Sequence, residues 1–334
     1  MQYRTLGESN LSVSVITFGA WAAGGWMWGK TDRQEAVKAI RASYDLGVTS
    51  IDTAPVYGQG TSEEIVGEAL VGIPRDKVQI LTKFGMRWDL KEPKGDFAFK
   101  SKNNQGEAID LYRYAGRDSI IKECEDSLVR LRTDYIDLYQ IHWPESTTLI
   151  QESMEAAALL QKQGKVRHVG VCNYNADQMK EAEKYVTLLS NQVPYSMVKR
   201  EIEKAVVPHC IANKKSILSY SPLERGLLTG KMKSGYPFQE GDHRASLYFF
   251  NDENIGRTTA FLMKIKPMAD EKNISLAQLV LKWTIEQPGI TIALAGARNA
   301  EQAIANAKAS EVTLTKDEIG IINGHLNRLE IVKP

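Results

Sequence analysis

Short apolar runs alternate with amphipathic segments along most of this sequence. From Arg33 to Leu46, apolar or aromatic residues recur at positions 36, 37, 40 and 44, which is helical spacing. Gly47 follows, where a helix end favours a left-handed residue. Eight apolar runs separated by such helical patterns predict strands at Val15–Phe18, Thr49–Asp52, Val78–Phe84, Ile136–Ile141, Val166–Cys172, Leu188–Gln192, Ile217–Ser219 and Ile292–Ala295.

Further helices are predicted between and after these strands, at Ser62–Leu70, Arg117–Leu131, Ile150–Gln163, Ala176–Tyr185, Ile202–Asn213, Arg257–Glu271, Leu276–Gln287, Ala300–Ala309 and Lys316–Asn327. Apolar strands that alternate with helices indicate a parallel sheet covered by its helices. Eight repeats in 334 residues favour a closed (β/α)8 TIM barrel, an α/β fold that spans residues 1–334 as a single domain. A doubly wound sheet is disfavoured, because no Gly-x-Gly-x-x-Gly stands between the first strand and the first helix.

Three stretches fall outside the alternation. Arg4–Gly7 and Leu11–Ser14 flank a turn and predict a β-hairpin before the first barrel strand. Gly85–Gly116 and Gly235–Gly256 are predicted to be long loops. Each follows a strand, so both are expected over the rim at the carboxyl ends of the strands, where loops shape substrate pockets.

Composition and charge argue against several classes of function. A formal net charge of +1 offers no basic field for nucleic acid, and no run of about 18 apolar residues suggests a membrane span. The amino-terminal residues lack the apolar core of a signal peptide. Cys124, Cys172 and Cys210 have neither pairing nor metal-ligand spacing. We therefore expect a cytoplasmic protein with reduced thiols and no metal site.

Polar residues gather where three successive predicted strands end. Asp52 and Tyr57 follow the second strand, Lys83 lies near the end of the third, and His142 follows the fourth. Because the carboxyl ends of barrel strands converge, these four side chains are expected to share one rim. Each of them alone is more often structural, as a rim ion pair or a packed histidine. The four together indicate catalysis.

The chemistry of this set fits proton donation to a carbonyl oxygen. A lysine beside a tyrosine favours phenolate, so Lys83 is expected to lower the pKa of Tyr57, while Asp52 fixes the lysine. A glycine turn then leads to a helix that is predicted to start at Ser62, whose hydroxyl would cap free N–H groups, with Glu63 and Glu64 in the first turn.

Several motifs occur in a fixed order along the chain. They are Asp52-Thr53-Ala54 with Tyr57-Gly58, Gly67-Glu68-Ala69-Leu70, Thr82-Lys83, Asp134-Tyr135-Ile136-Asp137-Leu138-Tyr139 before His142, Gly164-Lys165-Val166-Arg167, Gly170-Val171-Cys172-Asn173-Tyr174, Gln192, and Tyr220-Ser221-Pro222-Leu223. This ordered set resembles the aldo-keto reductase family over nearly the whole chain, from Leu6 to about Asn306. Within the family it is most similar to the bacterial family 11 group, which includes general stress protein 69 and an inositol-operon reductase.

The resemblance implies a nicotinamide cofactor bound without a Rossmann domain and reduction of a carbonyl by hydride transfer. Tyr57 would be the general acid, Lys83 and Asp52 its tuning pair, and His142 a donor that orients the carbonyl. NADP(H) is the expected cofactor. NAD(H) use stays open, because the segment after Gly296 departs from the Lys-Ser version of many NADP-specific relatives.

The same resemblance implies a set of cofactor-binding residues. Asn173 and Gln192 would hold the carboxamide, Tyr220 would stack on the nicotinamide, and Arg298 would clamp a 2′-phosphate. Cys172 stands where most relatives have serine, and is expected to be a small buried residue of this site without a catalytic role. The rest of the set is Trp21, Ser221, Pro222, Leu223, Gly226, Lys231, Gly296, Gln302 and Asn306.

Tryptophans and a short carboxyl terminus bear on the substrate. Trp21, Trp26, Trp28 and Trp143 are expected at the pocket mouth, because three tryptophans in one glycine-rich loop are poorly placed for burial. The chain stops soon after its last predicted helix, which leaves little of the long loop that steroid-reducing relatives use. An open, polar pocket for small aldehydes, quinone-like carbonyls or sugars is therefore expected.

Two other functions compete with carbonyl reduction. A nucleotide-dependent sensor or accessory subunit, of the potassium-channel β type, would keep the fold and the cofactor while acting through partners. A metal-dependent barrel hydrolase would need a second histidine in ligand spacing with His142, and the other histidines are scattered. The expected partner is a small carbonyl compound, and a monomer is favoured by family habit, with an oligomer left open.

Overall fold

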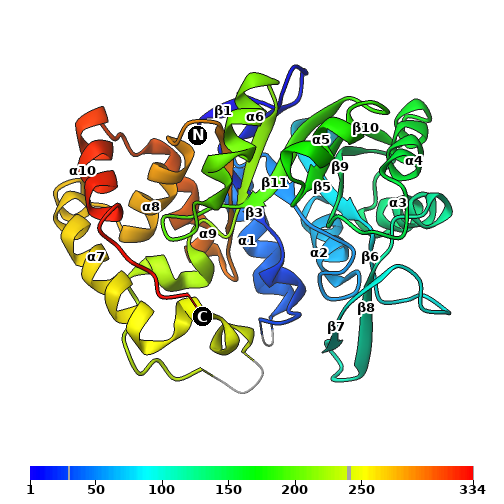
Figure 1. The fold of residues 1–334 in the computed structure, drawn as a ribbon. Coiled ribbons are helices and arrows are strands. Elements are labelled where there is room, and N and C mark those ends of the chain that lie inside the picture. Colours follow the sequence, from blue (N-terminus) through cyan, green and yellow to red (C-terminus); the bar gives the residue numbers. More distant parts are fainter. Residues whose placement is uncertain (29–30, 239–241, 334) are drawn as a thin grey trace.

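Parallel strands close into a barrel at the centre of the molecule (Figure 1). A computed structural model describes residues 1–28, 31–238 and 242–333. Within them, eight strands pair in the order β10-β11-β12-β13-β3-β4-β5-β9 and close on themselves. Their bounds are β3 (Ile16–Gly19), β4 (Ser50–Asp52), β5 (Gln79–Phe84), β9 (Ile136–Ile141), β10 (Val166–Cys172), β11 (Leu188–Pro194), β12 (Ser216–Tyr220) and β13 (Ile290–Gly296). The predicted (β/α)8 barrel is confirmed.

Helices surround the barrel (Figure 1). They are α1 (Arg33–Asp45), α2 (Thr61–Ala69), α3 (Arg117–Leu131), α4 (Ile150–Lys162), α5 (Ala176–Ala182), α6 (Val206–Ala212), α7 (Asp252–Glu271), α8 (Leu276–Ile285), α9 (Ala300–Lys308) and α10 (Lys316–Leu326). Side-chain caps fix several starts: Asp32 accepts from the Glu35 N–H before α1, and Asn175 and Ser275 form reciprocal capping boxes at α5 and α8.

A hairpin fills the amino-terminal end of the barrel. β1 (Tyr3–Thr5) and β2 (Ser12–Ser14) pair antiparallel, as predicted. Leu6, Leu11 and Val13 are buried and belong to one cluster with Leu81 and Leu138 of the barrel strands. In Figure 1 this hairpin lies at the top and the long strands β7 and β8 lie at the bottom. The hairpin therefore closes the end of the barrel opposite to the rim from which the long segment with β7 and β8 projects.

The stretch Gly85–Gly116, predicted to be a loop, forms a separate antiparallel sheet. β6 (Met86–Arg87) and β7 (Asp96–Lys102) both pair with β8 (Ala108–Arg113). The loop prediction was wrong because β7 and β8 mix charged and apolar residues on partly exposed faces, so that neither contains a long apolar run. The loop after β3 contacts this sheet: Trp26 stacks on Phe99 of β7 with ring centroids 6.2 Å apart.

Ile202–Asn213, predicted to be one helix, is divided. A 3-10 turn over Glu201–Lys204 precedes α6. Pro208 explains the break, because proline has no N–H and its ring excludes the carbonyl four residues earlier from helical geometry.

The second predicted loop, Gly235–Gly256, is shorter than expected. α7 begins at Asp252 because Asn251 accepts a hydrogen bond from the Asn254 N–H. Short 3-10 turns occupy His243–Ser246 and Tyr248–Phe250. Positions 239–241 of the predicted loop lie outside the described residues.

Ser62 does not cap α2, contrary to the prediction. The helix begins one residue earlier, after Gly60, whose φ is 98°. The Ser62 hydroxyl donates to the Ala20 carbonyl over 2.8 Å and shares a 2.8 Å hydrogen bond with the Thr53 hydroxyl. It therefore ties the start of α2 to the ends of β3 and β4, beside the turn that carries Tyr57.

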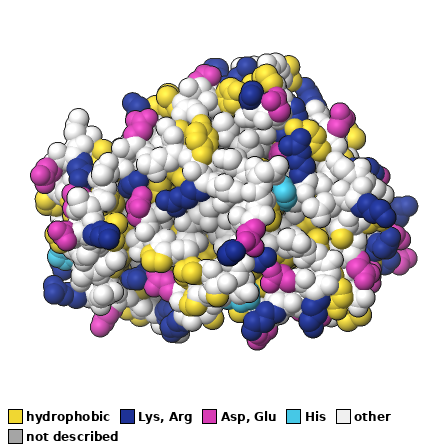
Figure 2. Space-filling model, turned by 90° about the horizontal axis from the view of Figure 1, so that it is seen from above, with side chains coloured by type: hydrophobic (Ala, Val, Ile, Leu, Met, Phe, Trp, Pro, Cys, Tyr) yellow, Lys and Arg dark blue, Asp and Glu magenta, His cyan; other side chains and the backbone are white. Residues whose placement is uncertain are grey.

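The molecular surface is of mixed charge. Figure 2 shows lysine and arginine side chains interspersed with acidic ones on the face seen from above, in line with the formal net charge of +1. Among the described helices, none is long and apolar enough to cross a membrane.

Candidate active site

Asp52, Tyr57, Lys83 and His142 lie together at one end of the barrel. Asp52 ends β4, Lys83 precedes the last residue of β5, and His142 directly follows β9. These three strands are neighbours in the barrel, and Tyr57 lies in the turn between β4 and α2. The structure thus brings together the four side chains that the sequence analysis grouped.

Lys83 is at the centre of this arrangement. Its Nζ donates to Asp52 Oδ1 over 2.6 Å and to the Thr53 carbonyl over 2.8 Å, and lies 5.0 Å from the centroid of the Tyr57 ring. The Lys83 and Asp52 side chains are 1% and 4% exposed. Gln192 Nε2 donates to the other carboxylate oxygen over 2.7 Å. The ion pair is therefore buried, with both carboxylate oxygens satisfied, which fixes the ammonium in one position.

His142 stands edge-on to Tyr57. The ring centroids are 5.7 Å apart and the ring planes are inclined by 80°. The backbone N–H of His142 donates to the Phe84 carbonyl over 2.9 Å, and its carbonyl accepts from Asn173 Nδ2 over 3.1 Å. These bonds fix the backbone of His142 at the position from which its ring packs against the phenol.

Burial raises the pKa of Tyr57 to about 12, and the positive charge of Lys83 opposes this without reversing it. The expectation of a lowered pKa is therefore wrong for this state of the protein. The physical reason is that phenolate loses its hydration inside the site, and one already paired ammonium does not replace it. Tyr57 consequently keeps its proton throughout the neutral pH range.

The neighbouring groups have complementary protonation states. Burial, and then the charge of Lys83, holds the pKa of His142 well below its ordinary value, so the imidazole is neutral. Burial acts to lower the pKa of Lys83, but Asp52 and Tyr57 outweigh it and leave that pKa raised. The site therefore holds a neutral acid, a neutral imidazole and a permanent ammonium.

Amide side chains extend the site along β10 and β11. Tyr220 donates from its hydroxyl to Asn173 Oδ1 over 3.0 Å. Asn173 has a φ of 61°, in the left-handed region that asparagine tolerates best among residues other than glycine. Cys172 is 1% exposed, and burial raises the pKa of its thiol. Gln192 donates to Asp52 through its side-chain amide. To hold the carboxamide of a nicotinamide as predicted, the same amide would also have to reach the cofactor.

The turn after β12 has an uncommon backbone. Ser221, Glu224, Arg225 and Gly226 have φ values of 54°, 42°, 51° and 98°. Left-handed residues in tight turns are frequent where successive N–H groups form an anion-binding concavity. Three more residues predicted to bind the cofactor belong to this segment, namely Pro222, Leu223 and the exposed Lys231.

One tryptophan packs directly on Tyr57, and a second packs against the first. Trp21 stacks on the Tyr57 ring with centroids 5.9 Å apart, and Trp28 is edge-on to Trp21 at 5.3 Å. His243 packs against both indoles, and its Nδ1 lies 2.9 Å from the Met27 carbonyl. Loops that are far apart in sequence therefore meet over the phenol.

The other two tryptophans differ from each other. Trp26 is 5% exposed and packs beneath Phe99, so its expected place at the pocket mouth is wrong. Its indole N–H donates to the Ser101 hydroxyl over 3.1 Å, which gives the ring an interior partner. Trp143 is half-buried next to His142.

The residues predicted for the adenosine end lie at α9. Arg298 Nη2 donates to the Trp28 carbonyl over 2.7 Å, and its backbone N–H donates to Gln302 Oε1 over 3.0 Å. Asn306 Nδ2 donates to the Gly296 carbonyl over 3.0 Å. These polar groups satisfy one another and tie α9 to the tryptophan loop.

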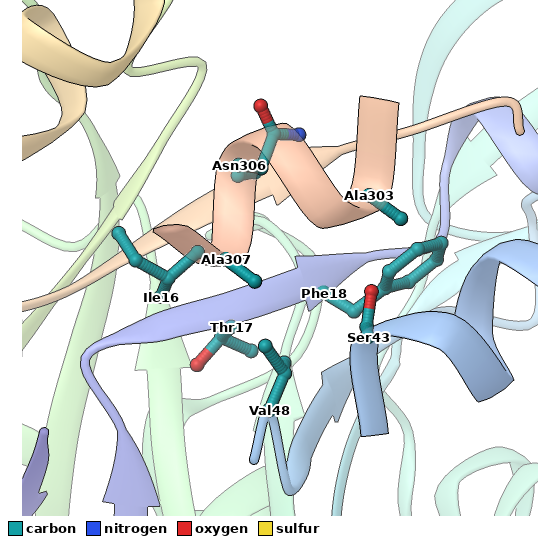
Figure 3. A pocket seen from close by; sticks show the side chains of 9 residues that line it. Ile16, Thr17, Phe18, Ser43, Val48, Ala303, Asn306 and Ala307 are labelled. Atoms are coloured by element: carbon teal, nitrogen blue, oxygen red, sulfur yellow. The ribbon is translucent and has the colours of Figure 1, made fainter. Parts of the chain in front are cut away.

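Figure 3 shows how α9 presents this face. Ala303 and Ala307 point from the helix toward β3, whereas Asn306 points away from the strand. The cavity beneath them measures about 10 Å³, room for about one water molecule. It is a packing gap, far too small for a nucleotide.

Three polar groups at the rim of the barrel were not predicted from the sequence. The Thr53 carbonyl binds Lys83, and no side-chain pattern marks a carbonyl. Arg225 Nε and His243 Nε2 are buried without a hydrogen-bond partner among the described residues. Arg225 directly precedes a segment predicted to border the cofactor, which was a usable signal, whereas His243 lies in a loop without a pattern.

The donor set suits a nicotinamide dinucleotide. The amides of Asn173 and Gln192 can both donate and accept, as a carboxamide requires, and the unpartnered Arg225 Nε offers a donor to an anion. In the described part of the chain, no group of three or more His, Cys, Asp and Glu side chains is arranged to hold a metal ion.

Comparison with known proteins identifies the family. A sequence model of the aldo/keto reductase family matches residues 15–327. Aldo-keto reductase YhdN of Bacillus subtilis (strain 168) is 38% identical over 97% of this chain and 93% of its own length. The NADH-specific methylglyoxal reductase of Escherichia coli (strain K12) is 34% identical over 97% of this chain and 98% of its own. The solved glycerol dehydrogenase AKR11B4 from Gluconobacter oxydans has a TM-score of 0.87 at 34% identity, covering 99% of this chain and 97% of that one. The chain therefore belongs to the aldo-keto reductase family, and these relatives agree with its resemblance to the bacterial family 11 group.

Proposed function

We propose that this protein is an NADP(H)-dependent reductase that converts a small aldehyde or ketone to the alcohol. The observation that carries the proposal is the position of the Lys83 ammonium between the Asp52 carboxylate and the Tyr57 ring, with neutral His142 at the edge of that ring. A phenol supported in this way can give up its proton only when negative charge develops on a nearby oxygen.

Each of the four residues has a separate task in this proposal. Tyr57 donates its proton to the carbonyl oxygen as that oxygen becomes an alkoxide. Lys83 stabilises the phenolate that remains, and Asp52 holds the lysine in place. Neutral His142 donates a hydrogen bond that orients the carbonyl, and it competes little for the proton because its pKa is low.

The cofactor, when bound, supplies the hydride. Asn173, Gln192 and Tyr220 would hold its nicotinamide end, the turn from Ser221 to Gly226 its pyrophosphate, and Arg298 a 2′-phosphate. One relative is named as NADH-specific. We therefore include NAD(H) as a second cofactor to be tested in every assay.

The test is a titration of the purified protein with NADPH and NADH, followed by addition of a simple aldehyde. We expect binding and then oxidation of the bound cofactor, with NADPH preferred. Tyr57→Phe should abolish turnover while leaving cofactor affinity nearly intact, because only the proton donor is lost. Turnover at the wild-type rate in this variant would refute the role of Tyr57.

The same experiment decides the sensor alternative. A nucleotide-dependent sensor or accessory subunit would bind the cofactor tightly and leave it unoxidised when aldehyde is added. Absence of binding to either cofactor would contradict both proposals.

A further inference from the structure

Arg113 is a half-buried cation beside the substrate end of the site. It is the last residue of β8 and stands opposite Met86 of β6. Met86 follows Lys83 by three positions in the chain. Among the described residues, the buried Nε of Arg113 has no hydrogen-bond partner and no carboxylate lies in ion-pair contact with its guanidinium. The guanidinium carbon lies 5.0 Å from the centroid of the Trp143 ring, and Trp143 directly follows His142.

A second arginine of the same sheet, Arg87, is ion-paired within the protein and serves as a comparison. Arg87 Nε lies 2.8 Å from Asp89 Oδ1, and Arg87 Nη1 lies 3.4 Å from Glu123 Oε1. Arg87 is therefore neutralised within the protein. Arg113, one strand away, is not.

The acids near Arg113 already have partners. Asp96 stands opposite Arg113 in the β7–β8 ladder, but its carboxylate accepts from the Ser146 N–H and hydroxyl, each over 2.7 Å. Glu145 accepts from the Ala115 N–H over 3.2 Å and from the Thr147 N–H over 2.6 Å. Neither carboxylate is placed to neutralise the guanidinium.

The surroundings of Arg113 are apolar and continuous with the catalytic tyrosine. Met86 and Leu111 are buried in one cluster, against which both Tyr57 and Trp143 pack. Arg113 is half-buried next to these apolar side chains, so an incoming anion meets a cation whose attraction is screened less than on the open surface. In Figure 1 the sheet that carries Arg113 projects from the end of the barrel opposite to the amino-terminal hairpin, which is the end that carries the catalytic residues.

We propose that Arg113 binds a carboxylate or phosphate group of the substrate, so that the physiological substrate is an aldehyde or ketone with an anionic group a few bonds from its carbonyl. This inference rests on the proposed reductase function. A guanidinium presents a planar fork that matches the oxygens of either group. Arg225 and Arg298 lie on other loops, on the side assigned to the cofactor, so Arg113 is free for the substrate.

Matched substrate pairs test the proposal. The pairs are succinic semialdehyde with butanal, and glyceraldehyde 3-phosphate with glyceraldehyde, each corrected for its hydrated fraction. The ratio of kcat/KM within a pair measures recognition of the anion, and the two pairs distinguish carboxylate from phosphate. Arg113→Met removes the charge and keeps the apolar stem, and Arg113→Lys keeps the charge and loses the fork. Lys91→Met is the control, because Lys91 is an exposed lysine between β6 and β7.

We expect the wild-type protein to prefer the anionic member of at least one pair by about 10- to 100-fold, chiefly through KM. In Arg113→Met this ratio should fall toward one, and the rise of KM with added salt should disappear. Arg113→Lys should restore part of the preference, and Lys91→Met should keep all of it.

Three outcomes would overturn the inference. They are turnover of the neutral aldehydes without an anionic preference in the wild-type protein, a preference that survives in Arg113→Met, and an equal loss on both members of a pair, which would indicate a structural role. Failure to reduce any carbonyl compound with either cofactor is a different result, because it refutes the reductase function itself.

Discussion

At the scale of single residues, Lys83 and Asp52 depend on each other because both of their charges are buried. Removing one partner of a buried ion pair leaves an uncompensated charge, at a cost of about 3–5 kcal/mol, whereas removing both does not. Lys83 also has a second task, since it faces Tyr57. Its structural and chemical contributions can therefore be measured separately.

Lys83→Met should lower both the free energy of unfolding and turnover, the latter by about 100-fold or more. The double variant Lys83→Met/Asp52→Asn should recover most of the stability and none of the turnover, because the charge that supports the phenolate is still missing. Urea unfolding and cofactor oxidation, measured on the same preparations, check both statements. Recovery of turnover in the double variant would limit Lys83 to a structural role.

Glu123 gives the fold a specific pH dependence. It is 4% exposed, and burial raises its pKa to about 7, against the opposing effects of Arg87 and the Gly85 N–H. A raised pKa means that the folded state binds the proton more tightly than the unfolded state, so this contribution to stability is lost as pH rises from about 4.5 to about 7. Glu123→Gln cannot titrate, and the melting temperature of the wild type should fall relative to that of the variant over this interval. If the melting temperatures of the wild type and the variant changed with pH by the same amount from pH 5 to pH 8, the raised pKa of Glu123 would be contradicted.

At the scale of elements, α2 approaches α3 so closely that one glycine is required. A Cβ at Gly67 would lie 2.6 Å from the Arg130 carbonyl, in a helix where alanine would otherwise be preferred. Gly320 in α10 has open space at the same position.

Gly67→Ala should therefore destabilise the protein by about 1–3 kcal/mol, because the clash with backbone exceeds the gain in helix propensity. Gly320→Ala should stabilise it by about 0.5–1 kcal/mol, since only the propensity changes. Denaturant unfolding of the two variants side by side is the measurement. Equal effects would show that α2 can shift away from α3 without cost.

The strands and helices of the barrel were predictable because the apolar pattern of each short segment indicates which of its residues are buried. β9 is buried along its whole length and β10 at all but Arg167 and His168, each strand is mostly apolar, and the helices between strands carry apolar residues at regular spacing. The sheet of β6, β7 and β8 was not, since its strands are half exposed and mix charged with apolar residues. Ser62 was assigned to a cap because its actual partner, the Ala20 carbonyl, is remote in sequence.

The site was predictable as a group of residues and unpredictable in its energetics. Strand ends that converge bring Asp52, Lys83 and His142 together whatever the loops do. The raised pKa of Tyr57 instead depends on how deeply the ring is buried, and the indole of Trp21 that covers it comes from a separate loop. The unpaired state of Arg113 was also invisible, because the sequence does not tell which acids are already engaged.

At the scale of the whole molecule, the three cysteines report on global unfolding. Cys124, Cys172 and Cys210 are free and buried, and burial raises the pKa of each thiol, that of Cys124 to about 12. Thiolate is the reactive form, so all three should be inert in the folded protein.

Under native conditions, a disulfide reagent such as DTNB should label none of the three thiols on the timescale of minutes, and all three should react once the protein is unfolded in denaturant. The labelling rate at intermediate denaturant should follow the unfolded fraction measured by circular dichroism. Rapid labelling of one thiol in the native protein would instead show a local opening, and single Cys→Ser variants would identify it.

The sheet of β6, β8 and β7 leaves the barrel after β5 and returns before α3, and within the described residues it shares no ladder with the barrel strands. Its chain can therefore lengthen, shorten or be replaced over evolutionary time without disturbing the strands that hold Lys83 and His142. Descendants of one ancestral reductase could exchange this segment as a unit and inherit a new range of substrates together with unchanged chemistry. Selection would then act on recognition and on catalysis through different stretches of one gene.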